Sequence, residues 1–333
     1  MSQKVRLRRL RYNKTVRDLF EDTHLRPQDL IYPIFVCEGK NIKNEIKSMP
    51  GQYQISVDRL PSLCNKLIEL NIKSVILFGV PDKKDDDGKV AQDDNGIVQR
   101  AVKEIKKTNN EILVIVDVCH CQYTLHGHCG TIDKGDVDND KTVTNLGLQA
   151  LSLARAGADV IAPSDMMDGR VNHIRNILDK NNFEKLPIFS YSVKYASAFY
   201  GPFRDAAENT PQHGDRKSYQ MNYKNSLEAM REAETDINEG ADALIVKPAM
   251  SYLDIIYRIK SKYSIPVIAY NVSGEYSMAH SAVDKNWIDK QVIFEILTSM
   301  KRAGANAIIT YHAIEVAEYP VSYTHLRAHE TYP

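Results

Sequence analysis

Two lysines stand where short apolar segments end, on segments that we predict to be neighbouring strands. Lys194 ends the segment 191–194, and Lys247 directly follows the apolar residues 243–246. Burial lowers the pKa of a lysine from its free value of about 10.4, and so does a second cation nearby. A neutral amine is the nucleophile that forms an imine with a ketone. The pair therefore predicts imine chemistry, with an ion-pair role for one of the two lysines as the alternative.

Three cysteines are crowded into a short segment that follows another predicted strand. Cys119, Cys121 and Cys129 have the spacing C-x-C-x₇-C. Three thiolates suit Zn²⁺ and leave its fourth position for water or substrate, as catalytic zinc requires. His126 and His128 lie in the same segment and are alternative ligands. The segment predicts a catalytic zinc site built from the three cysteines.

Charged residues accompany both features. Asp117 ends the strand before the cysteines, so we expect it to lie beside the metal and move protons. Arg204, Arg216 and Lys217 lie on the long connection 195–219, which is a candidate lid. The planar fork of an arginine suits bidentate binding of a carboxylate, so these cations are candidates for binding an acidic substrate. Solvent-exposed charge is the alternative.

These residues need a scaffold that gathers the ends of several strands. Eight short apolar segments recur along the chain, most followed by a stretch of helical periodicity. Their continuous hydrophobicity indicates strands buried on both faces, as in a parallel sheet. We therefore predict a (β/α)₈ TIM barrel over residues 26–319, with catalytic groups at the carboxyl ends of its strands. The predicted strands are 30–36, 74–80, 112–118, 159–163, 187–190, 243–246, 266–270 and 307–311, and the predicted helices are 58–70, 97–107, 142–156, 170–180, 223–239, 252–262 and 288–303.

The predicted barrel also has expected features in the connections between its helices and strands. Gly157, Gly240 and Gly304 each follow a predicted helix, where a glycine accepts the left-handed conformation that reverses the chain. The acidic and basic connection 81–95 is predicted to be a solvated surface loop.

Composition and charge limit the other possibilities. The 333 residues carry a formal net charge of +0, which gives no indication of nucleic acid or membrane as a partner. No apolar run approaches the ~20 residues of a membrane span, and five cysteines indicate reduced thiols, so we expect a cytoplasmic protein. The basic residues 1–25 are interpreted as an arm that packs on a neighbouring subunit, with binding of nucleic acid as the alternative.

The segments that carry this chemistry resemble one enzyme family along most of the chain, from about Arg6 to Glu318. The family is porphobilinogen synthase, also called δ-aminolevulinic acid dehydratase. It is a hydro-lyase family, and the resemblance implies condensation of two 5-aminolevulinate molecules into porphobilinogen in tetrapyrrole (heme) biosynthesis. The segments with the resemblance are 117–130, 191–194, 199–207, 214–220, 246–249 and 272–276.

The resemblance also implies roles for individual residues. Lys194 and Lys247 match the two Schiff-base lysines, with Lys247 more firmly tied to the first-bound substrate. The three cysteines match the zinc ligands of the family's cysteine-rich branch. The remaining matches are Arg204 and Arg216 for one substrate carboxylate, Ser273 and Tyr311 for the other, and Glu232 for an activating magnesium ion near a subunit interface. Family members are typically homo-octamers with an N-terminal arm.

One part of the chain departs from the family, and two other functions compete with it. Residues 320–333 do not resemble the family's last helix and are predicted to be a non-native tail. A class I aldolase also uses a barrel and an imine, but it usually needs one such lysine and no three-cysteine zinc site. A zinc-stabilised module that binds RNA is the alternative from another class, and the single cysteine cluster argues against it.

Overall fold

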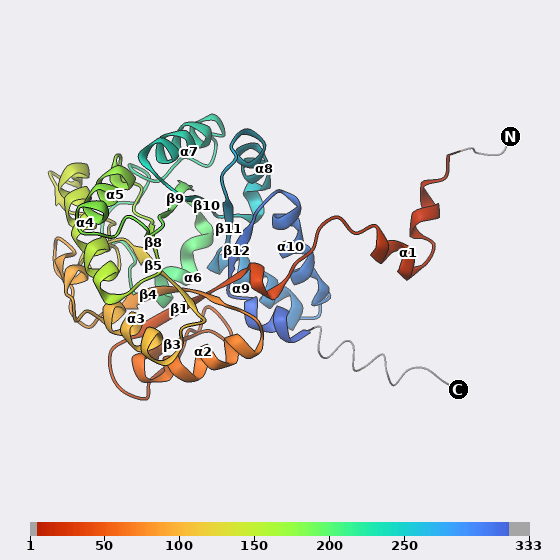
Figure 1. Cartoon of the computed structure of the whole chain (residues 1–333), viewed down its shortest axis with the longest axis horizontal. Coiled ribbons are helices and arrows are strands. Elements are labelled where there is room, and N and C mark those ends of the chain that lie inside the picture. The colour runs from red at the N-terminus through yellow and green to blue at the C-terminus, as the bar shows by residue number, and fades with distance from the viewer. Residues whose placement is uncertain (1–4, 320–333) are drawn as a thin grey trace.

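The computed structural model describes residues 5–319, and most of them form one parallel barrel surrounded by helices (Figure 1). The barrel strands are hydrogen-bonded in the order β8-β5-β4-β1-β12-β11-β10-β9, and every neighbouring pair is parallel. A bridge between Ile161 and Ile188 joins the two ends. The strands are β1 (Leu30–Cys37), β4 (Ser74–Val80), β5 (Leu113–Val118), β8 (Val160–Pro163), β9 (Phe189–Lys194), β10 (Ala243–Lys247), β11 (Val267–Asn271) and β12 (Ala307–Thr310). The predicted TIM barrel is confirmed.

A layer of helices covers the outside of the barrel. The helices of this layer are α2 (Leu60–Glu69), α3 (Ile97–Thr108), α4 (Asn139–Ala156), α5 (Arg170–Lys180), α7 (Leu227–Glu239), α8 (Leu253–Lys262) and α10 (Gln291–Arg302). Gly157, Gly240 and Gly304 follow three of these helices with φ of 99°, 103° and 115°, so each has the predicted left-handed conformation.

Short helices and two hairpins lie in the connections and in the N-terminal segment. The short helices are η1 (Leu7–Arg11), α1 (Lys14–Leu19), η2 (Pro27–Asp29), η3 (Val57–Arg59), η4 (Lys89–Gln92), η5 (Ala198–Tyr200), α6 (Gly201–Ala206) and η6 (Met250–Tyr252). The hairpins pair β2 (Lys43–Glu45) with β3 (Tyr53–Ser56) and β6 (Ile132–Asp133) with β7 (Asp136–Val137). A further helix, α9 (Ser273–Asp284), follows β11 directly.

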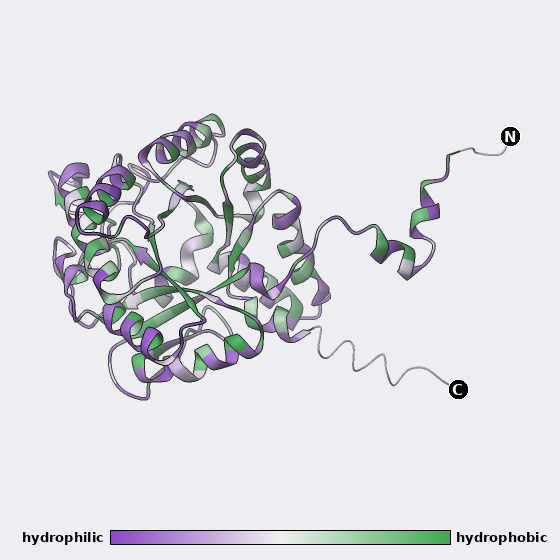
Figure 2. Cartoon of the chain, in the orientation of Figure 1, coloured by the Kyte–Doolittle hydropathy of each residue, from purple (hydrophilic) through white to green (hydrophobic). Residues whose placement is uncertain are grey.

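The core has two parts because successive side chains of a strand point to opposite faces. Along β1, Ile31 and Phe35 belong to the cluster inside the barrel, whereas Leu30 and Ile34 pack under the helices. Figure 2 shows hydrophobic strands at the centre and hydrophilic residues on the outer sides of the helices. Full burial of a leucine or isoleucine side chain contributes about 1.5–3 kcal/mol, so the two faces together hold the strands in register.

The sequence missed α9 and part of β9. Helix α9 begins at Ser273, where the carboxylate of Glu275 accepts a hydrogen bond from the Val272 N–H at 3.0 Å. Gly274 in its first turn weakens the helical pattern, because glycine is a poor helix former. Strand β9 runs four residues beyond its predicted end, so Lys194 lies in the strand and not after it.

The connection 81–95 lies largely at the surface, as predicted, but hydrogen bonds also join it to residues 123–125. The Asp85 N–H donates to the Tyr123 carbonyl at 3.0 Å, and the Leu125 N–H donates to the Asp85 carbonyl at 2.9 Å. The Asp85 carboxylate accepts from the N–H of Lys89 at 3.0 Å. This connection therefore supports the segment that carries the three cysteines, and its acidic residues are partly structural.

The N-terminal arm extends away from the barrel (Figure 1). Its large hydrophobic side chains are exposed in the isolated chain, and they are Val5, Leu7, Leu10, Tyr12, Leu19 and Phe20. Across residues 5–319, every helix is too short or too polar to span a bilayer.

A buried ion pair ties the helices to the strand that carries Lys194. The Arg170 guanidinium at the start of α5 donates to the carboxylate of Asp236 on α7 at 3.1 Å. The Ser190 hydroxyl on β9 donates to the same oxygen at 2.7 Å. Both charged side chains are 2% exposed. Removal of Asp236 would leave the buried Arg170 charge with only the longer contact to Asp165, at 3.8 Å, which is costly in free energy.

We predict that Asp236→Ala lowers the free energy of unfolding by about 3 kcal/mol, because the buried Arg170 charge then keeps only the longer contact with Asp165. Denaturant unfolding followed by circular dichroism measures this change. Asp179→Ala is the matched control, since Asp179 forms an exposed pair with Arg175, and we expect a loss below about 1 kcal/mol. Equal losses in the two variants would contradict the prediction.

Candidate active site

The two lysines lie side by side at the carboxyl ends of neighbouring strands. Lys194 on β9 and Lys247 on β10 are partners in the parallel register. Both are buried, at 4% and 5% exposed. They line a small enclosed cavity, and the other residues of its wall are Phe78, Asp117, Cys121, Ser164, Tyr200, Phe203, Arg204 and Arg216. The barrel thus assembles residues from distant parts of the sequence around two amines.

Aromatic rings surround the amine of Lys247. Its Nζ lies 4.4 Å from the centre of the Tyr270 ring, 4.9 Å from that of Phe203 and 5.2 Å from that of Tyr200. Burial, and then the positive charge of Lys194, lower the pKa of Lys247 to about 7. Lys247 therefore carries a substantial fraction of neutral, nucleophilic amine near neutral pH.

Lys194 differs from the expectation that both lysines have a lowered pKa. Its ammonium donates to the Ser164 carbonyl. Burial lowers the pKa of Lys194, but the charges of nearby cysteines, led by Cys129, outweigh burial and raise it above the ordinary value. The sequence identified two similar lysines, whereas their surroundings lower the pKa of Lys247 and raise that of Lys194.

Asp117 ends β5 and lies in the wall of the same cavity. Burial raises the pKa of its carboxyl to about 6, against the opposing charges of Lys194 and Lys247. Its Oδ1 atom is buried without a hydrogen-bond partner among the described residues. A carboxyl that titrates near neutral pH beside two amines has the properties of a proton-transfer group.

Cys119, Cys121 and Cys129 come together as a cluster with the geometry of a metal site. Their Sγ atoms lie within 4.8 Å of one another, and those of Cys119 and Cys121 are 3.4 Å apart. The donor set, three buried free thiols, fits Zn²⁺.

His126 and His128, the two alternative metal ligands, contact backbone carbonyls instead. His126 Nε2 contacts the Asp86 carbonyl at 2.9 Å, and His128 Nε2 contacts the His213 carbonyl at 2.9 Å. Neither histidine belongs to the cysteine cluster. The structure thus brings the three cysteines together and leaves His126 and His128 as supports of the surrounding loops.

Arg204 and Arg216 reach the cavity from the connection 195–219. The Arg216 guanidinium donates to the carbonyls of Gly127 and Asn209, both at 2.7 Å, which fixes its position. The Nε atoms of both arginines are buried without a partner among the described residues, so each retains a donor for a ligand. Lys217 instead forms an exposed pair with Asp215 at 2.7 Å.

Ser273 and Tyr311 lie just behind the aromatic wall around Lys247. The Phe203 N–H donates to the Ser273 hydroxyl at 2.9 Å, and the hydroxyls of Tyr311 and Tyr270 are 3.0 Å apart. Ser273 contacts Phe203 and Tyr311 contacts Tyr270, and the rings of Phe203 and Tyr270 are the ones next to the Lys247 amine. Neither Ser273 nor Tyr311 lines the small cavity. A substrate carboxylate would reach them only if these aromatic side chains move.

Glu232 lies far from the lysines, on helix α7. Burial raises the pKa of its carboxyl to about 7. Within residues 5–319, the clusters of His, Cys, Asp or Glu donors that are close enough to hold a metal do not include Glu232.

Sequence patterns did not identify the residues that shape the environment of the lysines. Tyr191, Tyr200, Phe203 and Tyr270 come from four elements and read as ordinary core residues in the sequence. Asn209 was also missed, although its side-chain amide donates to Cys121 Sγ at 3.2 Å. The alternation of aromatic and polar residues before Lys194 was the available indication, and the aliphatic residues before Lys247 gave none.

The fold and the site define a parallel (β/α)₈-barrel enzyme that has paired buried amines beside a cysteine metal centre. Comparison with known proteins specifies the family. The family model described as delta-aminolevulinic acid dehydratase matches residues 4–319, so the chain belongs to this family. The cysteine cluster fits its zinc-binding branch, and the predicted enzyme class, a hydro-lyase, is confirmed.

Individual relatives agree with this result. The delta-aminolevulinic acid dehydratase of Bacillus subtilis (strain 168) is 53% identical over 315 residues, which cover 94% of this chain and 97% of that protein. The enzyme of the same name from Staphylococcus epidermidis is 53% identical over 317 residues, which cover 94% and 98%. A crystal structure of this enzyme from Toxoplasma gondii ME49, in complex with the reaction product porphobilinogen, superposes with a TM-score of 0.95 at 42% identity, covering 99% of this chain and 96% of that chain.

We predict that covalent labelling of Lys247 by formaldehyde and cyanoborohydride rises through a pH of about 7 and is constant above it, because the reactive form is the neutral amine. Mass spectrometry of the labelled peptide measures this profile. Lys194→Met removes a neighbouring positive charge and shifts the profile to higher pH, whereas Asp117→Asn removes a negative charge and shifts it to lower pH. A profile that both variants leave unchanged would contradict this account.

Proposed function

We propose that this chain condenses two molecules of 5-aminolevulinate into porphobilinogen through imines on Lys247 and Lys194, in tetrapyrrole biosynthesis. The observation that carries the proposal is the register pairing of two buried lysines in one cavity that also contains Arg204 and Arg216. One amine would suffice for a class I aldolase, whereas two amines beside carboxylate-binding cations suit two keto acids. The names of the relatives support the same substrate.

Lys247 is the first nucleophile in this proposal. Its neutral amine attacks the ketone carbon of one substrate, and loss of water gives the imine. Protonation of the imine makes the adjacent carbon acidic, which prepares it for bond formation. The aromatic rings around Lys247 keep water away from this centre and favour the neutral amine.

Lys194 holds the second substrate as an imine close to the first. Arg204 and Arg216 bind the carboxylate of one substrate through their remaining N–H donors, and Ser273 with Tyr311 binds that of the other. Carbon–carbon and carbon–nitrogen bonds then form between neighbours held in register, with loss of water, and close the pyrrole. Such positioning supplies a large part of the acceleration of a two-substrate reaction.

Asp117 moves protons between the two substrates. Its unpartnered Oδ1 lies in the cavity wall with both amines. Cys119, Cys121 and Cys129 would hold a catalytic zinc ion, which when bound acts as a Lewis acid on one substrate. The three cysteines place that ion at the cavity, because Cys121 is part of its wall.

The remaining proposals concern assembly. Residues 1–25 form an arm whose exposed hydrophobic side chains pack on a neighbouring subunit, and residues 26–319 form the catalytic barrel of a homo-octamer. Sedimentation of the chain with and without residues 1–25 would test the arm. Glu232 binds an activating magnesium ion near a subunit interface, and a magnesium response that survives in Glu232→Gln would contradict this role. The predicted non-native tail, residues 320–333, lies outside the described residues.

We predict that the purified chain converts 5-aminolevulinate to a pyrrole, measured with a colorimetric pyrrole reagent. Lys247→Met lowers kcat by at least about 10³-fold, because the nucleophile is lost. Borohydride added with substrate traps an adduct on the Lys247 peptide of the unmodified chain, measured by mass spectrometry.

Lys262→Met is the matched control, since Lys262 is an exposed lysine at the end of α8 and we expect its turnover to be unchanged. Turnover by Lys247→Met close to that of this control would overturn the proposed mechanism. Absence of pyrrole from the unmodified, zinc-loaded chain would overturn the proposed reaction.

Removal of the metal tests the cysteine site separately. We predict that chelation lowers the activity by roughly tenfold or more and that added zinc restores it, because the metal stabilises developing charge on the substrate. Cys121→Ser should show the same loss without recovery. Cys64→Ser is the control, since Cys64 is a buried free thiol outside the cluster. Full activity in chelator would show that the cysteine metal is not catalytic.

A further inference from the structure

A second group of metal-binding side chains lies outside the active site, at the carboxyl end of the barrel. His280 projects from α9, and His312 and Glu315 follow β12. One ligand atom from each of the three lies within 4.8 Å of the others. His280 Nε2 is 3.2 Å from Glu315 Oε1, and His312 Nδ1 also contacts this oxygen. The rings of the two histidines stack, with centres 5.3 Å apart.

The separation of His280 Nε2 from Glu315 Oε1, 3.2 Å, suits a tetrahedral metal ion. Zinc bonds to histidine nitrogen and carboxylate oxygen are about 2.0–2.2 Å long, which places neighbouring ligand atoms about 3.3 Å apart. Two imidazole nitrogens and one carboxylate oxygen are a donor set that zinc and other borderline divalent ions accept. His280 and Glu315 therefore need little movement to hold such an ion, whereas His312 Nδ1, which contacts the same oxygen directly, must move away from it.

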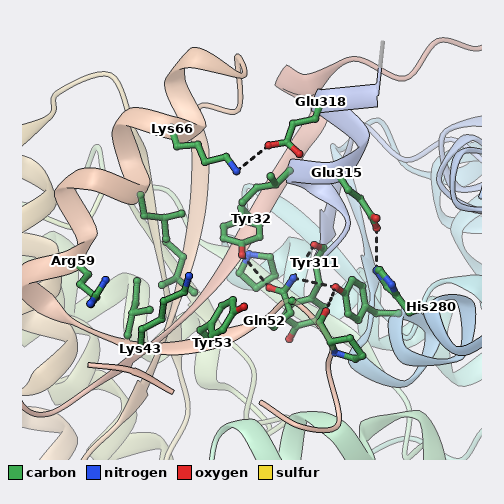
Figure 3. Close-up of a pocket in the computed structure, with 18 of the residues that line it drawn as sticks. Tyr32, Lys43, Gln52, Tyr53, Arg59, Lys66, His280, Tyr311, Glu315 and Glu318 are labelled. Atoms are coloured by element: carbon green, nitrogen blue, oxygen red, sulfur yellow. Dashed lines mark hydrogen bonds and ion pairs between the residues drawn. The ribbon is translucent and has the colours of Figure 1, made fainter. Parts of the chain in front are cut away.

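A cavity supplies the fourth position. His280 and Glu315 line a cavity of about 580 Å³ between α2, α9 and the residues after β12. Figure 3 shows these two side chains joined on the right of the view, and the basic residues Lys43 and Arg59 on the left. Water or an anion in this cavity can complete the coordination.

Two further observations point to a ligand here. His312 is fully buried, and its Nε2 has no hydrogen-bond partner among the described residues. Lys290 approaches Glu315 at 3.6 Å, so the carboxylate attracts cations already. The Lys290 side chain is 44% exposed and can turn toward solvent when a metal ion takes its place.

We propose that His280, His312 and Glu315 form a second zinc site, distinct from the cysteine site. The ion would fasten α9 to the residues after β12. Ser273 begins α9, and Tyr311 immediately precedes His312. The site would therefore hold in place the two elements that carry the proposed ligands of one substrate carboxylate. Binding of the ion itself does not depend on the proposed function.

Zinc titration of the full chain, already loaded at the cysteine site, tests the proposal. At each free zinc concentration, bound zinc per chain is measured by mass spectrometry after equilibrium dialysis, and Tm by scanning calorimetry. We expect the unmodified chain to take up one more zinc ion than His280→Asn at saturation. We also expect a rise in Tm of roughly 4 °C, absent in His280→Asn, because the ion binds only the folded chain.

Two further variants make the result specific. His173→Asn is the matched control, since His173 is a partly exposed histidine on α5, and it should behave like the unmodified chain. Glu315→Gln keeps the shape of the side chain and removes its charge, so it should lose the extra ion even if His280→Asn folds poorly. Equal zinc uptake and equal Tm shifts in the unmodified chain and in either site variant would overturn the proposal.

Discussion

The structure depends on the burial of two amines next to each other at the end of a parallel sheet. Two ammonium ions in this position repel each other and lose their hydration, so the site cannot keep both charged without compensation. The two lysines differ in their surroundings, and this difference keeps them from both being charged. Aromatic rings around Lys247 favour its neutral form, while the cysteines and the Ser164 carbonyl stabilise charge on Lys194. In the proposed reaction, each amine would thus take a different part.

The parallel barrel makes such an arrangement possible, because it directs the carboxyl ends of all strands to one side. Lys194 and Lys247 meet only because β9 and β10 pair in this register. A shift of one residue would turn one lysine toward the helices, since side chains alternate along a strand. The Arg170–Asp236 pair with Ser190 supports β9 from behind, so packing outside the barrel contributes to the geometry inside it.

The sequence predicted the features that depend on residues close together in the chain. It missed those that depend on contacts between residues far apart in the chain. Strand ends, the cysteine spacing and the glycine turns are local, and apart from the end of β9 the structure places them as expected. The different protonation of the two lysines could not be predicted, because it arises from rings and thiols that come from other strands. The hydrogen bonds that hold the connection 81–95 could not be predicted for the same reason, since they join the Asp85 backbone to that of Tyr123 and Leu125.

The same contrast applies to Ser273 and Tyr311, which the sequence matches to a substrate carboxylate but which do not line the small cavity around the lysines. They contact Phe203 and Tyr270, which separate them from the amine of Lys247. Phe203 belongs to α6, on the connection that also carries Arg204, whereas Tyr270 lies in the barrel wall. Movement of α6 would thus open the path to Ser273 and displace Arg204 together. Under the proposed function, binding of the two substrate carboxylates would then be coupled through one short helix.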